Sequence, residues 1–190
     1  MTWEEVCHQS EALQMLHPES PLDGGFFMRE DRLNKLREGS SMLIWQDLHH
    51  SELSVTDLYT LLALRNEVFV VEQNCPYQDI DGDDLLGENR HILGWQDGKL
   101  VAYARILKSD SEFEPVVIGR VIIDKSVRGE KLGYQLMEQA MASCQQFWPE
   151  TTVYLGAQAH LQAFYAHFGF SPVTDVYDED GIPHLGMANR

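Results

Sequence analysis

One stretch of the sequence indicates the fold: residues 121–133 read VIIDKSVRGEKLG. An apolar, β-branched run typical of a strand leads into a basic turn with glycines, and the turn opens a helix with apolar residues at helical spacing. A helix leaves its first N–H groups unpaired, so such a turn can hold a pyrophosphate. Gly129 and Gly133 permit close approach of a ligand to the backbone. Arg128 and Lys131 add positive charge, although the same glycines would also suit a tight strand-to-helix turn without a ligand.

The segments on either side of this stretch predict an α/β fold, a mixed sheet with helices packed on it. Asp-Gly pairs at 97–98 and 180–181 supply the positive φ angles of tight hairpin turns. Ser54, with Asp57 three residues later, has the form of a helical capping box. The run 116–123 is apolar and β-branched, so we expect a central strand that is buried on both faces. The other predicted strands are residues 43–45, 91–95, 100–107, 152–155, 173–177 and 184–187, and the predicted helices begin near residues 54, 132 and 161.

The composition indicates one globular domain with a short appendage. The chain has 190 residues, of which 44% are hydrophobic and 23% charged, and this is enough apolar material for a substantial core. Regular periodicity begins at Met42, whereas residues 1–41 carry prolines, glycines and a charged stretch without a sustained apolar face. We therefore assign residues 42–190 to the domain. Residues 1–41 form an appendage and linker of unknown origin, which we expect to be dispensable for stability and turnover.

Charge and hydropathy argue against several functions. The formal charge is -16, from 14 Lys and Arg against 30 Asp and Glu, so nucleic acid is not an expected partner. No apolar run approaches the length of about 20 residues that a membrane-spanning helix needs, and Glu4 and Glu5 stand where a secretory signal places positive charge. Of the cysteines, Cys144 lies in an apolar helical pattern and should be core, whereas Cys75 lies in a polar loop and should be exposed. We expect a cytoplasmic protein without membrane contact.

The loop and the helix after it resemble the coenzyme A loop of the GNAT acetyltransferases. That family has the pattern Arg/Gln-x-x-Gly-x-Gly/Ala, to which Arg128 and Gly133 correspond, whereas Lys131 stands at the middle glycine. Downstream, Tyr165 and the turn at Gly169 are similar to the family's tyrosine-bearing helix and the turn after it. The resemblance spans residues 42–190. Three further runs resemble the ElaA-like branch of the family: VVEQNCPY at 70–77, DIDGD at 79–83 and YLGAQAH at 154–160.

The resemblance implies a GNAT-like fold, with a mostly antiparallel central sheet, two parallel strands that splay apart, and flanking helices. It also implies N-acetyl transfer, in which a primary amine attacks the thioester of acetyl-coenzyme A directly. Tyr165 would be the catalytic residue that gives a proton to the leaving thiolate. The strand edge, the loop and a glutamine where the family often has Asn would bind the cofactor. These cofactor-binding residues are Val121, Ile122, Ile123, Arg128, Gly129, Glu130, Lys131, Leu132, Gly133 and Gln158.

The general base is not evident, because the strand 116–123 bears no carboxylate or histidine. Water is one alternative, and four side chains are candidates by residue type: Glu72, His91, His160 and His184. The alternating carboxylates of residues 79–84 resemble a calcium loop, but Asp84 and Arg90 stand where an EF-hand needs Gly and Glu. This loop is therefore either a solvated turn or a lip that attracts a cationic amine, and we expect no metal site.

Two other functions are compatible with the sequence. A non-catalytic sensor of acyl-coenzyme A would have the same loop and would bind the cofactor without turnover. An acidic interaction protein would use the loop only as a turn and would not bind coenzyme A. For the enzyme, the expected partner is a small-molecule or peptide amine, and a homodimer is compatible with the sequence.

Overall fold

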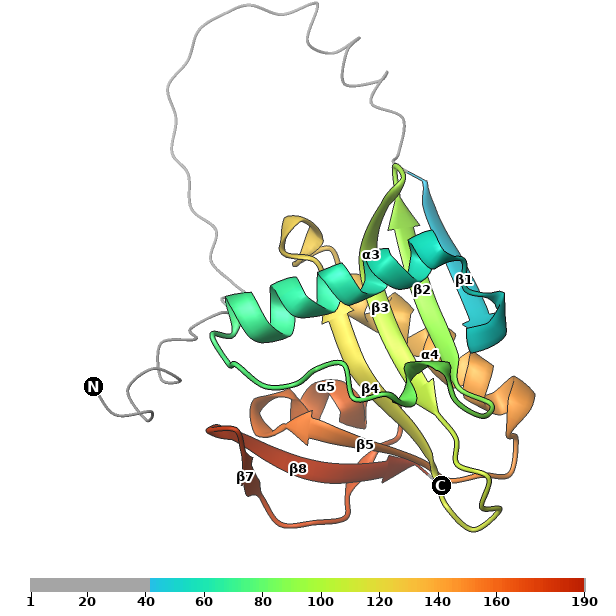
Figure 1. The fold of residues 1–190 in the computed structure, drawn as a ribbon. Helices are drawn as coiled ribbons and strands as arrows, with labels where there is room; N and C mark the ends of the chain where they lie inside the picture. Colours follow the sequence, from blue (N-terminus) through green and yellow to red (C-terminus); the bar gives the residue numbers. More distant parts are fainter. Residues whose placement is uncertain (1–41, 190) are drawn as a thin grey trace, which may run out of the picture.

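The computed structural model describes residues 42–189, which form one mixed sheet with helices on both faces (Figure 1). The eight strands follow the order β1-β2-β3-β4-β5-β8-β6, and β7 pairs with β8. Neighbouring strands are antiparallel except β4 and β5, which are parallel. The predicted α/β fold with a mostly antiparallel sheet is confirmed. The strands are β1 Leu43–His49, β2 Arg90–Gln96, β3 Lys99–Leu107, β4 Val116–Ile123, β5 Val153–Gln158, β6 Ser171–Pro172, β7 Tyr177–Glu179 and β8 Ile182–Asn189.

Two long helices cover opposite faces of the sheet (Figure 1). Helix α3 (Val55–Arg65) buries its leucines against residues of β2, β3 and β4. Helix α4 (Leu132–Phe147) covers the other face, and its predicted apolar side forms the main core. Helix α3 continues into the π-helix η2 (Asn66–Glu72), and the short helix α5 (Gln162–Ala166) packs beside β5. The 3-10 helices are η1 His50–Glu52, η3 Asp83–Leu85, η4 Lys125–Val127 and η5 Ala159–Leu161.

The helix cap and the hairpin turns that the sequence predicts are both present. The Ser54 hydroxyl accepts a hydrogen bond from the amide of Asp57, and the Asp57 carboxylate accepts one from the amide of Ser54, so the capping box is confirmed. Both Asp-Gly pairs have positive φ angles and close the β2–β3 and β7–β8 hairpins. None of the helices within residues 42–189 is long and apolar enough to cross a membrane.

Strand β4 packs into the core on both faces, as expected, but its burial is less complete than predicted. Its buried residues alternate with residues that are only partly covered. Val116 and Ile118 lie in the core under α4, whereas Ile122 lies in the cluster under α3. Residues at even spacing normally share a face, so an extra residue in β4 must reverse the alternation between Ile118 and Ile122.

Two expectations are wrong. Residues 173–176 do not form a strand: the Val173 N–H donates to the carbonyl oxygen of Gly186 at 2.9 Å, but the Gly186 N–H donates to the hydroxyl of Thr174 at 2.8 Å and not to a backbone carbonyl. Cys75 is buried, with 7% of its surface exposed, because its loop folds back onto the sheet. Cys144 lies in the core as expected, and burial raises the pKa of its thiol to about 12. Cys7 and the appendage 1–41 lie outside the described residues.

Candidate active site

Strands β4 and β5 separate part of the way along their length. They pair at two positions, beginning with Val116 and Val153, although β4 continues to Ile123. Beyond these two pairs, β5 still pairs with β8. From residue 118 to residue 123, the edge of β4 that faces away from β3 pairs with no other strand among residues 42–189. The expected pair of parallel strands that splay apart is present. The separation leaves backbone groups with which an extended ligand can pair.

A bulge in β4 lies beside the point of separation. From Tyr103 to Arg105, β3 advances two residues, whereas their partners in β4 are three residues apart. These partners are Ile122 and Gly119. The bulge therefore contains one more residue of β4 than of β3. Arg120 lies in this bulge, and its φ of 52° is in the left-handed region. Such bulges bend a strand and increase its twist, which accounts for the divergence of β4 from β5.

The turn after β4 brings the start of α4 to the end of this strand. Asp124 caps η4 by accepting a hydrogen bond from the amide of Ser126 at 2.9 Å. Leu132 anchors the start of α4 in a small cluster with Val101 and Val127. The first turn of α4 contains no acidic residue, and its N-cap side chain makes no capping hydrogen bond. The N–H group of Tyr134 donates to the carbonyl oxygen of Lys131 at 3.1 Å. The N–H groups of Leu132 and Gly133 are therefore the ones available to an anion.

Gly129 and Gly133 are glycine for different physical reasons. Gly129 has a φ of 89°, a conformation that residues with a side chain rarely adopt, so the backbone alone requires glycine there. Gly133 is helical, and a Cβ there would lie 3.6 Å from the ring of Phe164, which is an ordinary contact. Glycine inside a helix costs about 1 kcal/mol relative to alanine, so neither packing nor backbone explains Gly133. Lys131 has a φ of 62°, the conformation that the family's middle glycine would adopt freely.

Two of the predicted site residues, Arg128 and Glu72, contact each other. Nη1 and Nη2 of Arg128 donate to the two carboxylate oxygens of Glu72 at 2.5 and 3.0 Å. Arg128 Nε also donates to the carbonyl oxygen of Ile123 at 2.9 Å. The guanidinium therefore ties the end of β4 to η2 and holds the loop in place. The side chains of Glu130 and Lys131, in contrast, are exposed.

Tyr165 lies on α5, beside the start of α4. Its neighbour Phe164 is the ring that a Cβ at Gly133 would meet, so α5 and the loop are in contact. Tyr165 packs edge-on against Phe164 and Phe170, with ring centroids 5.0 and 6.4 Å apart. Burial raises the pKa of Tyr165 to about 12, because the charged form is penalised in the core. The phenol is therefore neutral at physiological pH and can donate a proton.

Two of the four candidate bases are engaged in other contacts. Both carboxylate oxygens of Glu72 accept hydrogen bonds from Arg128. His91 is fully buried, and burial lowers its pKa. Its Nε2 donates to the carbonyl oxygen of Asp84 at 2.9 Å, so its Nδ1 accepts from the Tyr103 hydroxyl at 2.8 Å. Neither residue is free to take a proton from a substrate in this structure.

The other two candidates lie at the end of β5. His184 on β8 is in register with Gln158, the last residue of β5. Its Nδ1 donates to the carbonyl oxygen of Ile182 at 2.8 Å, which leaves Nε2 as a hydrogen-bond acceptor. His160 is exposed on η5. The structure thus brings His184, His160 and the predicted cofactor residue Gln158 to the same end of the sheet.

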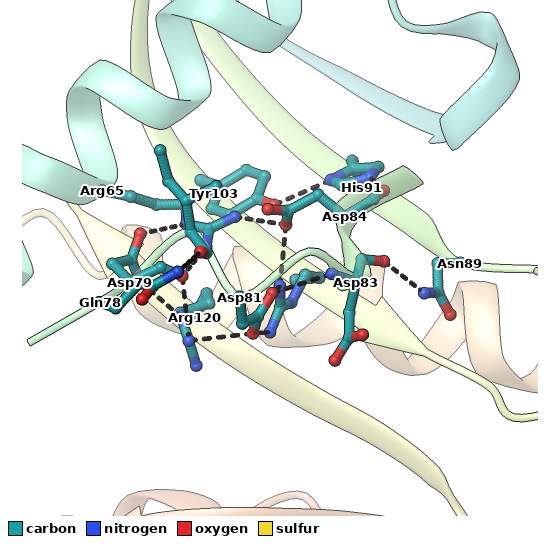
Figure 2. Close-up of polar contacts among 12 residues, drawn as sticks. Arg65, Gln78, Asp79, Asp81, Asp83, Asp84, Asn89, His91, Tyr103 and Arg120 are labelled. Atoms are coloured by element: carbon teal, nitrogen blue, oxygen red, sulfur yellow. Dashed lines mark hydrogen bonds and ion pairs between the residues drawn. The ribbon is translucent and has the colours of Figure 1, made fainter. Parts of the chain in front are cut away.

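A buried ionic network, which was not expected from the sequence, holds the acidic loop (Figure 2). Asp79 and Asp84 are each 5% exposed. Their partners are arginines from three elements: Arg65 at the end of α3, Arg105 on β3 and Arg120 on β4. The loop is therefore not a fully solvated turn, because Asp79 and Asp84 are buried, although Asp81 and Asp83 are exposed. The available signal was an arginine on an apolar face, since Arg65 follows the leucines of α3 and Arg105 stands inside an apolar strand.

The hydrogen bonds of this network are short, and nearly all of them join an arginine to a carboxylate. Arg65 donates to Asp79 at 2.8 Å and to Asp84 at 2.5 Å. Arg105 donates to Asp84 at 2.8 Å and to the two oxygens of Asp81 at 2.8 and 2.6 Å. Burial alone would raise the pKa of Asp79, but hydrogen bonds from arginine outweigh burial and lower it. Hydrogen bonds from Arg105 also hold the pKa of Asp81 well below its ordinary value.

The fold and this site define a class of protein. The family model for the Acetyltransferase (GNAT) domain matches residues 52–190 of this chain. The chain therefore belongs to the GNAT acetyltransferase family, and its general reaction is acyl transfer.

Within this family the chain is ElaA-like, as its sequence motifs predict. It is 71% identical to Protein ElaA of Escherichia coli (strain K12) over 149 residues, which cover 78% of this chain and 97% of that protein. The crystal structure of Escherichia coli ElaA matches with a TM-score of 0.76 and 69% identity, over 78% of this chain and 100% of that chain. An acyl-CoA N-acyltransferase from Pseudomonas aeruginosa matches with a TM-score of 0.76 and 52% identity, again over 78% and 100%.

Proposed function

We propose that this protein transfers an acetyl group from acetyl-coenzyme A to a primary amine that attacks the thioester directly. The observation that carries the proposal is the separation of β4 from β5 just before the uncapped start of α4. An extended pantetheine arm needs an unpaired strand edge, and a pyrophosphate needs free N–H groups. This end of the domain offers both, and the relative from Pseudomonas aeruginosa is described as an acyl-CoA N-acyltransferase.

The residues around the loop suit a phosphorylated donor. The backbone of residues 121–123 would pair with the pantetheine arm, and the backbone of residues 129–133 would hold the pyrophosphate. Gly133 supports this arrangement, because a Cβ there would occupy space next to the N–H groups of α4 while meeting no obstacle in the protein itself. Lys131 would add an exposed positive charge, and Arg128 would keep the loop in position through Glu72.

The proposed chemistry uses the strand edge and Tyr165. A backbone N–H of β4 would stabilise the oxyanion that forms when the amine attacks the thioester carbonyl. The carbon–sulfur bond then breaks, and the departing thiolate would take the phenolic proton of Tyr165. The attacking amine must also lose a proton. Of the four candidate side chains, His184 has the most suitable geometry, because its Nε2 can accept while its Nδ1 is held by Ile182; water is the alternative.

Mass spectrometry tests the proposal. The purified protein is incubated with acetyl-coenzyme A and a library of small amines and peptides, and products heavier by one acetyl group are sought. We expect acetylated amines whose formation requires both the protein and acetyl-coenzyme A. Tight coenzyme A binding without any product would contradict the proposal and favour a sensor. Absence of coenzyme A binding would favour an interaction protein.

A further inference from the structure

Arg120 has a backbone conformation that its place in a strand does not explain. Its φ is 52°, although it lies inside β4. A left-handed residue with a side chain is strained, and such strain persists only where surrounding contacts maintain it. In the type of bulge that contains a left-handed residue, glycine ordinarily occupies that position. The other residues with a side chain and a positive φ within residues 42–189 lie in turns or at a helix cap: Asn74, Asp97, Lys131 and Asp180.

The side chain of Arg120 is held by the acidic loop (Figure 2). Its Nε donates to Asp79 Oδ1 at 2.7 Å, and its Nη2 lies 3.3 Å from the carbonyl oxygen of Asp79 and 3.2 Å from Asp81 Oδ2. The two carboxylates are themselves fixed from other elements, Asp79 by Arg65 on α3 and Asp81 by Arg105 on β3. The guanidinium of Arg120 therefore contacts groups whose positions two other elements of the fold determine.

The bulge that contains Arg120 lies next to the point where β4 leaves β5. Pairing between the two strands ends at Val117, before the bulge, and residues 121–123 of the unpaired edge lie at the bulge and directly beyond it. We propose that Arg120 is a positioning residue for acyl transfer: its ion pairs with Asp79 and Asp81 maintain the strained left-handed conformation of the bulge, and this conformation places the strand edge that receives the thioester. This inference rests on the proposed function, because it concerns the placement of the same acyl donor.

A pair of substitutions separates the backbone conformation from the side-chain contacts. Arg120→Gly and Arg120→Ala both remove the guanidinium, but only glycine adopts a positive φ without strain. Asp79 keeps Arg65 and Tyr77 as partners in both variants, and Asp81 keeps Arg105, so no buried carboxylate is left without a partner. If the conformation of residue 120 positions the strand edge, the glycine variant should retain activity that the alanine variant loses.

The experiment measures kcat at saturating acetyl-coenzyme A, the Kd for coenzyme A and the melting midpoint. We expect Arg120→Gly to keep kcat within about threefold of the wild type and Arg120→Ala to lose at least tenfold. Both variants should still bind coenzyme A, because the loop at α4 is untouched. The Kd should change less than threefold in Arg120→Gly, and a larger change in Arg120→Ala would reflect the displaced edge that pairs with the pantetheine arm. Equal kcat values in the two variants, whether near the wild type or equally low, would overturn the proposal. If Arg120→Ala does not fold, Arg120→Gln replaces it, with the same expected loss.

A failure of the proposed function gives a different result. In that case the wild type itself would acetylate no amine, and kcat could not be compared. The positioning role is then tested without substrate, by the backbone amide chemical shifts of residues 121–123 in the free protein. They should match the wild type in Arg120→Gly and move in Arg120→Ala. Shifts that are identical in the two variants would overturn the positioning role.

Discussion

Replacement of Gly133 by Glu tests the coenzyme A site most directly, with Gly133→Ala as the matched control. A Cβ at this position would lie 3.6 and 3.7 Å from atoms of the Phe164 ring and 4.0 Å from Ile123 Cγ1, so the free protein accommodates a side chain. Alanine is favoured over glycine in a helix by about 1 kcal/mol. For a chain of 190 residues, this gain should raise the melting midpoint of Gly133→Ala by about 2–4 °C.

The glutamate variant should also fold, because a carboxylate in the first turn of a helix interacts favourably with the helix dipole, by about 0.3–1 kcal/mol. The same carboxylate would repel a pyrophosphate at the N–H groups of α4. Acetyl-coenzyme A at about 100 times its Kd should stabilise the wild type by about 2.7 kcal/mol. At 2–4 °C for each kcal/mol, this is a rise in melting midpoint of about 5–10 °C. We expect no such rise in Gly133→Glu.

A thermal shift assay, run with and without acetyl-coenzyme A, measures both effects on one instrument. Gly133→Ala should melt higher than the wild type without ligand and keep a ligand-induced rise close to that of the wild type, because the family's pattern has glycine or alanine at this position. An unchanged ligand-induced rise in Gly133→Glu would refute the assignment of the pyrophosphate to this loop. A folding defect cannot imitate the expected result, since the unliganded midpoint is recorded in the same experiment.

Three other predictions follow from single contacts. Tyr165→Phe removes only the hydroxyl, so turnover at saturating acetyl-coenzyme A should fall about 100-fold with little change in cofactor affinity, and near-normal turnover would exclude the residue from the mechanism. Lys131→Gly relieves a left-handed backbone and should raise the free energy of unfolding by about 1 kcal/mol in denaturant titrations, whereas equal stability in Lys131→Gly and Lys131→Ala would contradict the reasoning. Hydrogen bonds from Arg105 lower the pKa of Asp81, so the stabilisation is complete above about pH 5 and is lost progressively as the pH falls further. The melting midpoint should therefore drop on acidification, and less steeply in Asp81→Asn.

Features that depend on neighbouring residues in the chain were predictable from the sequence. The Asp-Gly hairpin turns and the Ser54 capping box involve residues no more than three positions apart, and both form as expected. The strand, loop and helix of residues 116–147 were also recognisable, because alternation and helical spacing are local patterns. The family and the coarse fold follow from these local patterns and from the motifs in them.

Only tertiary structure decided which polar groups meet. Arg128 and Glu72 are 56 positions apart, and Arg120 and Asp79 are 41 apart, so no local pattern reports either contact. The acidic loop looked solvated because carboxylates avoid burial unless they are paired, and its partners lie on other elements. These ion pairs depend on how the strands and α3 are placed, as does the bulge at Arg120, which needs a partner strand to define it. Charge is a property of each residue, but its neutralisation depends on which residues the fold brings together.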